Sequence, residues 1–159
     1  MEPSSETDPG FLHVFGALGA RGLRTDRGFQ RGDVLCRIPC TARRDRPARH
    51  TVQVDAITHV EVGVLSTMNH SCDPSVRLDT GRMLVITERD IARGEEITYF
   101  YPSTEWDMAV PFECRCGSRN CVGVVRGAEH LSPEVLERYF LNQHVLMLRK
   151  QPILTGGKR

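Results

Sequence analysis

The chain has 159 residues, of which 40% are apolar and 26% charged, and its formal net charge is +1. This length suits one domain with a single modest core, and the near-zero charge gives no reason to expect nucleic acid or a membrane surface as a partner. No stretch approaches the roughly 18 apolar residues of a membrane span, and the acidic start lacks the features of a secretory signal, so we expect a cytoplasmic protein, or a nuclear one in a eukaryote.

Most of the chain has the pattern of short β-strands. Residues 1–10 are polar and acidic, and we expect a disordered tail there. Alternation of apolar and polar side chains predicts strands at residues 34–38, twice within 50–64, at 83–87 and at 97–101. Residues 41–49 are rich in arginine and contain a proline, so they are predicted to form a solvated loop.

The first clear helix signal begins at Ser132. Ser132 can cap the helix, Pro133 suits its first position, and Glu134 places an acid in its first turn. Apolar residues then recur at helical spacing, and the helix is predicted to end near Lys150, before Pro152. The expected fold is therefore mainly β with one helix at the C-terminal end.

Cysteine usage gives the sharpest chemical indication. Six cysteines in an intracellular chain more often mean a metal site or catalysis than disulfides. Cys114, Cys116 and Cys121 have C-x-C-x4-C spacing, which can supply three soft ligands to a tetrahedral zinc. Cys72 is the best candidate for the fourth ligand; buried free thiols or a disulfide are the alternative. The remaining two thiols are expected to pack in the core: Cys36 and Cys40.

Several motifs resemble those of SET-domain lysine methyltransferases. Residues 68–74 (MNHSCDP) resemble the family's N-H-S-C-x-P motif, and residues 94–101 (GEEITYFY) look like its G-E-E-L-T-x-x-Y segment. The cysteine cluster is similar to the post-SET zinc motif, which takes its fourth thiol from the N-H-S-C cysteine. Residues 22–25 and 31–34 resemble the glycine motif that opens the domain, with Ala20 in place of its first glycine. The motifs follow the family order, as in short microbial SET proteins.

This resemblance implies a fold of small curled β-sheets with a knot-like crossing, in which the N-H-S-C segment lies beside the strand of the G-E-E-L-T motif. It also implies a division of the chain into a SET domain over residues 11–113, a post-SET zinc motif over 114–125, and a C-terminal helix and tail over 126–159.

The resemblance further implies S-adenosylmethionine as cofactor. Asn69 would bond the methionine end of the cofactor through its side chain, and His70 would hold the adenine mainly through its backbone. Gly22, with the backbone near Ala20 and Arg21, would cradle the cofactor from the other side.

Tyr101 would be the active-site tyrosine beside the methyl-transfer path, where it would also contact the cofactor. Methyl transfer from a sulfonium to an amine is an in-line displacement, so the protein must align a neutral amine and exclude water. Tyr99, Phe100 and Phe112 could add aromatic walls that suit a lysine stem and its cationic head. Core packing is the alternative for Tyr99 and Phe112.

Two departures from the family pattern bear on function. Phe100 occupies a position that is usually acidic, and no tyrosine precedes Tyr99, whereas family active sites usually draw a second tyrosine from upstream. The variable insert that helps choose substrate is nearly absent, so a protein partner or a homodimer could complete the site. Two functions remain open: a protein-lysine N-methyltransferase, or a SET-fold cofactor-binding protein that acts on a small-molecule acceptor or serves as a non-catalytic module. Trp106 has no role that the sequence indicates.

Overall fold

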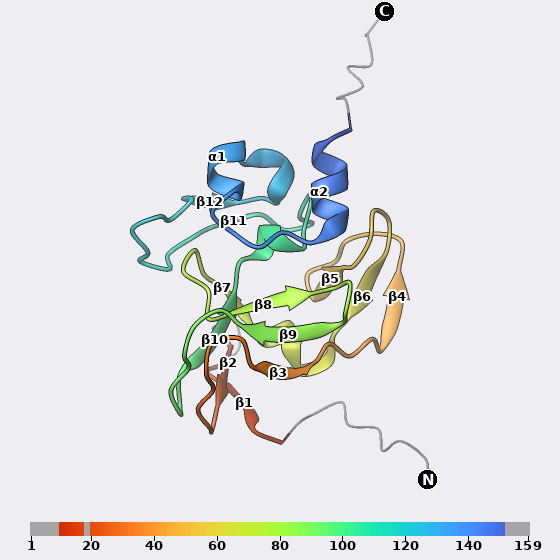
Figure 1. The fold of residues 1–159 in the computed structure, drawn as a ribbon. Coiled ribbons are helices and arrows are strands. Elements are labelled where there is room, and N and C mark those ends of the chain that lie inside the picture. Colours follow the sequence, from red (N-terminus) through yellow and green to blue (C-terminus); the bar gives the residue numbers. More distant parts are fainter. Residues whose placement is uncertain (1–9, 18–19, 152–159) are drawn as a thin grey trace, which may run out of the picture.

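Short strands in small sheets make up most of the computed structural model, which describes residues 10–17 and 20–151 (Figure 1). The predicted tail at residues 1–10 lies outside the described residues except for Gly10. The strands are β1 (Leu12–Phe15), β2 (Gly22–Thr25), β3 (Val34–Arg37), β4 (Ala42–Arg44), β5 (Thr51–Gln53), β6 (His59–Glu61), β7 (Asn69–His70), β8 (Val76–Asp79), β9 (Leu84–Thr87), β10 (Glu96–Tyr99), β11 (Phe112–Glu113) and β12 (Val124–Val125). The helices are η1 (Gly63–Thr67), η2 (Tyr101–Ser103), η3 (Ala128–His130), α1 (Pro133–Leu136) and α2 (Gln143–Arg149).

The described strands form four small sheets, with orders β1-β2-β10-β7, β3-β9-β8, β4-β6-β5 and β11-β12. The predicted mainly β fold is therefore confirmed. Strand β10 pairs antiparallel with β2 and parallel with β7, where Thr98 lies opposite Asn69 and Tyr99 opposite His70. The N-H-S-C segment thus lies beside the strand of the G-E-E-I-T motif, as the resemblance implies.

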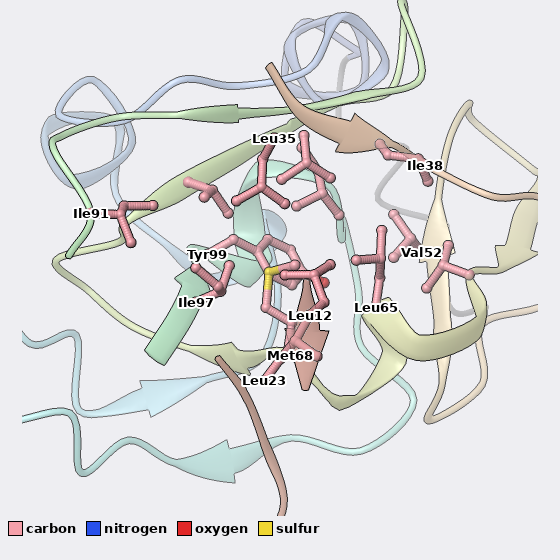
Figure 2. Close-up of a cluster of buried hydrophobic side chains, with 14 of the residues drawn as sticks. Leu12, Leu23, Leu35, Ile38, Val52, Leu65, Met68, Ile91, Ile97 and Tyr99 are labelled. Atoms are coloured by element: carbon pink, nitrogen blue, oxygen red, sulfur yellow. The ribbon is translucent and has the colours of Figure 1, made fainter. Parts of the chain in front are cut away.

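Two clusters of buried side chains meet at the end of β10. Figure 2 shows Met68 and Tyr99 at the centre of the main cluster, surrounded by apolar side chains from several sheets. The next residue, Phe100, points the other way into a second cluster and stacks on Tyr139, with ring centroids 3.6 Å apart. Because successive side chains of an extended segment alternate in direction, this one segment joins both cores. The usually acidic position thus holds a phenylalanine that packs in the second core.

The predicted loop at residues 41–49 is wrong in part, because Ala42–Arg44 form strand β4. This strand pairs with β6 at the edge of its sheet, and Arg44 forms a salt bridge with Glu61 on β6. The pairing is non-local, so the polar composition of the segment did not reveal it.

The single predicted C-terminal helix is also wrong, because the segment forms two short helices, α1 and α2, with a break between them. Ser132 caps α1 as predicted, and α2 ends before Lys150. At the break, Asn142 has an extended backbone and is only 2% exposed. Its side-chain oxygen accepts from the Thr80 backbone N–H at 2.8 Å, and its amide nitrogen donates to the carbonyls of Leu78 and Ser103, each at 2.8 Å.

These bonds fix Asn142 to β8 and η2, and they prevent α1 and α2 from forming one continuous helix.

Figure 1 shows α1 and α2 at the same end of the molecule as β11 and β12. No helix in the described part of the chain has the length and apolarity that a bilayer-spanning helix requires.

Replacing Asn142 by Ala should destabilise the protein, because it leaves several buried donors and acceptors without partners. We expect the free energy of unfolding to fall by about 2–4 kcal/mol, measured by urea denaturation. The matched control is Gln143→Ala, which truncates the exposed neighbouring amide and should change stability little. Equal stability of the two variants would contradict the anchoring role of Asn142.

Candidate active site and metal centre

A cavity of about 1310 Å³ runs along the β7–β10 pair. Four of the residues predicted for the cofactor and catalytic site line it: Arg21, Asn69, His70 and Tyr101. Ala20 and Gly22 are not among its lining residues. The structure therefore brings together predicted residues that lie as far apart in the chain as Arg21 and Tyr101. Because the cavity is larger than the usual range of small-molecule sites, about 300–1,000 Å³, it has room for a nucleoside-sized molecule and a second reactant.

The side chain of Asn69 holds the start of β2 against β7 and β10. Its amide nitrogen donates to the Arg21 carbonyl at 2.9 Å and to the Glu96 carboxylate at 2.8 Å. Gly22 allows this close approach, because a Cβ there would lie 2.5 Å from the Phe15 ring and 2.7 Å from the Glu96 carboxylate. Gly22 therefore lets the Phe15 ring and the Glu96 side chain pack against the start of β2, and the cofactor cradle that the family motif implies there stays a prediction.

His70 connects the cavity to the cysteine cluster. The ring is 9% exposed, and its Nδ1 accepts from the Tyr101 backbone N–H at 3.1 Å. Burial lowers the pKa of His70 to about 4, so the neutral ring carries its proton on Nε2, which lies 3.3 Å from the Cys72 sulfur. The side chain is therefore engaged inside the protein. A backbone contact from His70 to adenine stays a prediction.

The hydroxyl of Tyr101 donates to the Met68 carbonyl at 2.6 Å. Burial raises the pKa of Tyr101 to about 12, so this hydroxyl remains a donor at neutral pH. The Tyr99 ring lies 4.7 Å from that of Tyr101, and the Phe112 ring lies edge-on at 5.9 Å. These three rings line the cavity and form one aromatic wall. Phe100 is wrongly predicted as part of this wall, because it is buried in the second core.

Glu105 is a buried carboxylate of the cavity lining that the sequence motifs did not indicate. It is 6% exposed, it lines the cavity, and its carboxylate accepts from the Gln53 backbone N–H at 2.9 Å. The backbone N–H of Glu105 donates to the Tyr101 carbonyl at 2.9 Å, so the two residues lie one helical turn apart. A carboxylate four residues after the motif tyrosine was the available signal, but spacing alone did not show that it is buried.

The cysteine cluster has the geometry of a metal site. The sulfurs of Cys72, Cys114, Cys116 and Cys121 lie within 4.8 Å of one another, and that of Cys72 is 3.9 Å from that of Cys114. Four thiolates at the Zn–S distance of about 2.3 Å would stand roughly 3.8 Å apart in a tetrahedron. Burial raises the pKa of the Cys114 thiol to about 11, so a cation is needed to keep this ligand a thiolate at neutral pH, and four cysteine donors fit zinc.

The other two cysteines take no part in this cluster. Cys36 is half-buried against the main core, as predicted, and burial raises the pKa of its thiol to about 12. Cys40 is exposed, so the prediction that it packs in the core is wrong.

The small β-sheets are those of a known class of methyltransferases. The family model described as the SET domain matches residues 20–102, and the chain belongs to this family. The match lies within the SET domain predicted at residues 11–113, while the predicted boundaries themselves stay predictions.

Two relatives illustrate the range of the family. The methyltransferase flvH of Aspergillus flavus is 51% identical over 79 residues, which are 48% of this chain and 44% of flvH. A histone-lysine N-methyltransferase of Aspergillus fumigatus, specific for H3 lysine-4, is 40% identical over 68 residues, 38% of this chain and 6% of the relative. The chain thus spans less than half the length of either relative.

A solved structure supports the fold. KRYPTONITE in complex with mCHH DNA, an H3(1-15) peptide and SAH has a TM-score of 0.56 and 20% sequence identity. The similarity covers 71% of this chain and 29% of KRYPTONITE. It shows that the small sheets are arranged as in a SET-domain protein.

Elemental analysis tests the metal centre. Protein purified without chelator should contain one zinc per chain, and Cys72→Ser should lose most of it, because three thiolates hold the ion less well than four. Cys40→Ser is the matched control, since its thiol is exposed and outside the cluster, and it should keep full zinc content. Wild-type protein without metal, or equal loss in both variants, would refute the site.

Proposed function

We propose that this protein transfers a methyl group from S-adenosylmethionine to the ε-amine of a lysine in a protein substrate, and that zinc on the four cysteines has a structural role. The observation that carries the proposal is the Tyr101 hydroxyl, fixed by the Met68 carbonyl at the wall of the cavity that Asn69 and His70 also line. Relatives named as histone-lysine N-methyltransferases support a lysine acceptor.

Separate residues of the cavity would bind the cofactor and align the acceptor. The Arg21 backbone and the Asn69 amide would hold the amino-acid end of the cofactor at one end of the cavity. When bound, the cofactor supplies an electrophilic methyl group on a sulfonium. Tyr101 and Tyr99 would align the acceptor amine with that methyl group and keep water away from it. Phe112, which is 36% exposed, would cover the lysine stem from the outer side.

A second candidate function is methylation of a small-molecule amine. No upstream tyrosine is available, and Tyr139, the remaining tyrosine of the chain, stacks on Phe100 in the second core. The cavity also has a buried apolar portion, to which Val52 and Leu65 contribute, and this shape suits a small amine. The name of flvH specifies a methyltransferase without a protein substrate.

Cofactor binding is tested first. Calorimetry should show 1:1 binding of S-adenosylhomocysteine, and Asn69→Ala should weaken binding by about 1–3 kcal/mol, because the cradle formed by Asn69 and Arg21 is lost. Gln143→Ala, on the exposed face of α2, should bind as wild type does. Unchanged affinity in Asn69→Ala would remove this side chain from the cofactor site.

The role of Tyr101 is tested with Tyr101→Phe, which keeps the ring and removes only the hydroxyl. Folding and cofactor affinity should survive, while turnover should fall at least about tenfold, because one hydrogen bond that orients the reacting groups is lost. Activity is measured as label transferred from S-adenosylmethionine to peptides, total cell protein and small amines.

Tyr139→Phe is the matched control. The Tyr139 hydroxyl donates to the Cys72 carbonyl at 2.8 Å, outside the aromatic wall. Its loss should cost about 1 kcal/mol of stability with turnover retained. Labelling of small amines but not of protein would favour the second candidate, and equal turnover in both variants would contradict the role of Tyr101.

A further inference from the structure

Glu105 is a buried carboxylate for which the proposed methyl transfer has so far given no use. Its side chain is 6% exposed and belongs to the cavity lining. One carboxylate oxygen accepts from the Gln53 backbone N–H at 2.9 Å, and the Gln53 side-chain oxygen accepts from the Trp106 backbone N–H at 2.9 Å. The first bond ties the carboxylate to Gln53 of β5, and the second ties the following residue to the same glutamine, so both hold Glu105 against β5.

No arginine, lysine or histidine within residues 10–17 and 20–151 forms a salt bridge with Glu105. The neighbouring Thr104 and the Gln53 N–H are its polar partners, and burial outweighs them and raises the pKa of Glu105 to about 7. A buried carboxylate without a cation is unfavourable in a stable fold. Since its surroundings belong to a cavity, a cation that enters the cavity can serve as partner.

The position of Glu105 relative to the aromatic wall indicates which cation fits. The bond from its backbone N–H to the Tyr101 carbonyl puts Glu105 one turn beyond Tyr101. Tyr99 and Tyr101 line the same cavity as Glu105. Burial raises the pKa values of both tyrosines, and the negative charge of Glu105 raises them further. Val52 and Leu65 add apolar surface to the same cavity. An alkyl chain that ends in an ammonium matches this combination of apolar walls, aromatic rings and one carboxylate.

We propose that Glu105 binds the ammonium group of the acceptor and removes its proton before methyl transfer. This inference rests on the proposed function, because it assigns the acceptor class, a primary alkylamine, to the same site. It makes Glu105 a catalytic residue in addition to Tyr101.

The reaction consists of a proton transfer followed by a methyl transfer. A proton moves from the ammonium nitrogen of the acceptor to a carboxylate oxygen of Glu105, which leaves a neutral amine and a neutral carboxylic acid. The nitrogen lone pair then forms a bond to the methyl carbon, while the carbon–sulfur bond of S-adenosylmethionine breaks and its electron pair stays on sulfur. An alkylamine in water has a pKa of about 10.4. Burial disfavours charged groups and so reduces the free-energy gap between the bound ion pair and the neutral pair of acid and amine, which lets the neutral amine form from the ion pair inside the cavity. Glu105 later returns its proton to water.

Other titratable groups around Glu105 leave it as the group that changes charge near neutral pH. Tyr99 from β10 and Tyr101 from η2 have raised pKa values and stay neutral. His144 from α2 bonds the Thr104 carbonyl at 2.7 Å, and burial lowers its pKa, so it is largely neutral at pH 7. From β5 and η3, Glu105 meets only backbone N–H groups in these bonds: that of Gln53 donates to its carboxylate, and that of Ala128 donates to its backbone carbonyl. Burial, then the charge of Glu105, then that of Glu96 raise the pKa of Tyr101.

Glu105→Gln tests the proposal, because the amide keeps an oxygen for the Gln53 N–H and cannot ionise. Glu88→Gln is the matched control, since Glu88 pairs with Arg77 on a half-buried surface outside the cavity lining. At pH 7.5 the turnover of Glu105→Gln should be at least about tenfold below wild type, with zinc content and affinity for S-adenosylhomocysteine unchanged. The control should turn over as wild type does.

The pH profile separates a catalytic Glu105 from a structural one. Wild-type turnover should rise as pH increases through about 7, where Glu105 ionises. The turnover of Glu105→Gln should show no such rise near pH 7. Its rate should instead increase about tenfold per pH unit as the concentration of neutral amine in solution increases. The deficit should therefore shrink by pH 9.5. A constant deficit at every pH would overturn the proposal, as would wild-type turnover in Glu105→Gln.

Binding distinguishes failure of this inference from failure of the proposed function. With S-adenosylhomocysteine bound, n-butylammonium should bind to wild type and to Glu88→Gln, and at least about tenfold more weakly to Glu105→Gln. In wild type at pH 6.5, its addition should move the carboxyl carbon resonance of Glu105 to the ionised position. Glu105-dependent binding without methylation of any amine would refute the proposed function and leave the ammonium site standing. No binding to wild type, or equal binding to both variants, would overturn the inference whatever the activity.

Discussion

The parallel pairing of β7 with β10 is the interaction on which the rest of the structure depends. It joins only two residue pairs, Thr98 with Asn69 and Tyr99 with His70, yet both functional centres lie directly beyond it. On one side the Asn69 amide reaches the Arg21 carbonyl across the sheet. Two residues after His70, Cys72 enters the thiol cluster. A slip of one residue would exchange the faces of these side chains, so this register fixes the cavity and the metal centre together.

The metal centre and the cavity are mechanically linked in a second way. The loop that carries Cys114 and Cys116 also forms part of the cavity lining, so the thiol cluster holds a wall of the site in place. From the opposite side, His70 contacts both the Tyr101 backbone and the Cys72 sulfur. A tetrahedral ion at the cluster would therefore restrain the loop that faces the aromatic wall, which is a structural contribution to catalysis without any contact with the reactants.

Sequence patterns were informative where local chemistry decides the outcome. Alternation predicted five of the twelve described strands, namely β3, β5, β6, β9 and β10. Cysteine spacing predicted the thiol cluster, and the Asn-His-Ser-Cys segment predicted that Asn69 and His70 belong to the site that lines the cavity. The patterns failed where a single non-local contact prevails over local preference. Asn142 lies in a helical pattern, but its buried bonds to Leu78 and Ser103 interrupt the helix. Trp106 lacked a role because its backbone bond to Gln53 joins residues 53 positions apart.

The burial of Glu105 was likewise not predictable from local sequence. Its proposed role also gives a reason why the fold tolerates the free-energy cost of burying a carboxylate. An acidic residue in a polar stretch reads as a solvated side chain, and only the close approach of β5 and η2 removes it from water. A core designed for stability alone would hold an apolar side chain there, since the carboxylate makes the folded state less stable as pH rises from its ordinary pKa toward about 7. Natural proteins accept such conflicts between local environment and stability mainly at functional sites. A cationic acceptor that binds beside Glu105 would recover the free energy that ionisation of this buried carboxylate costs. Under the proposed function, this would make the cavity selective for amines over neutral molecules of the same shape.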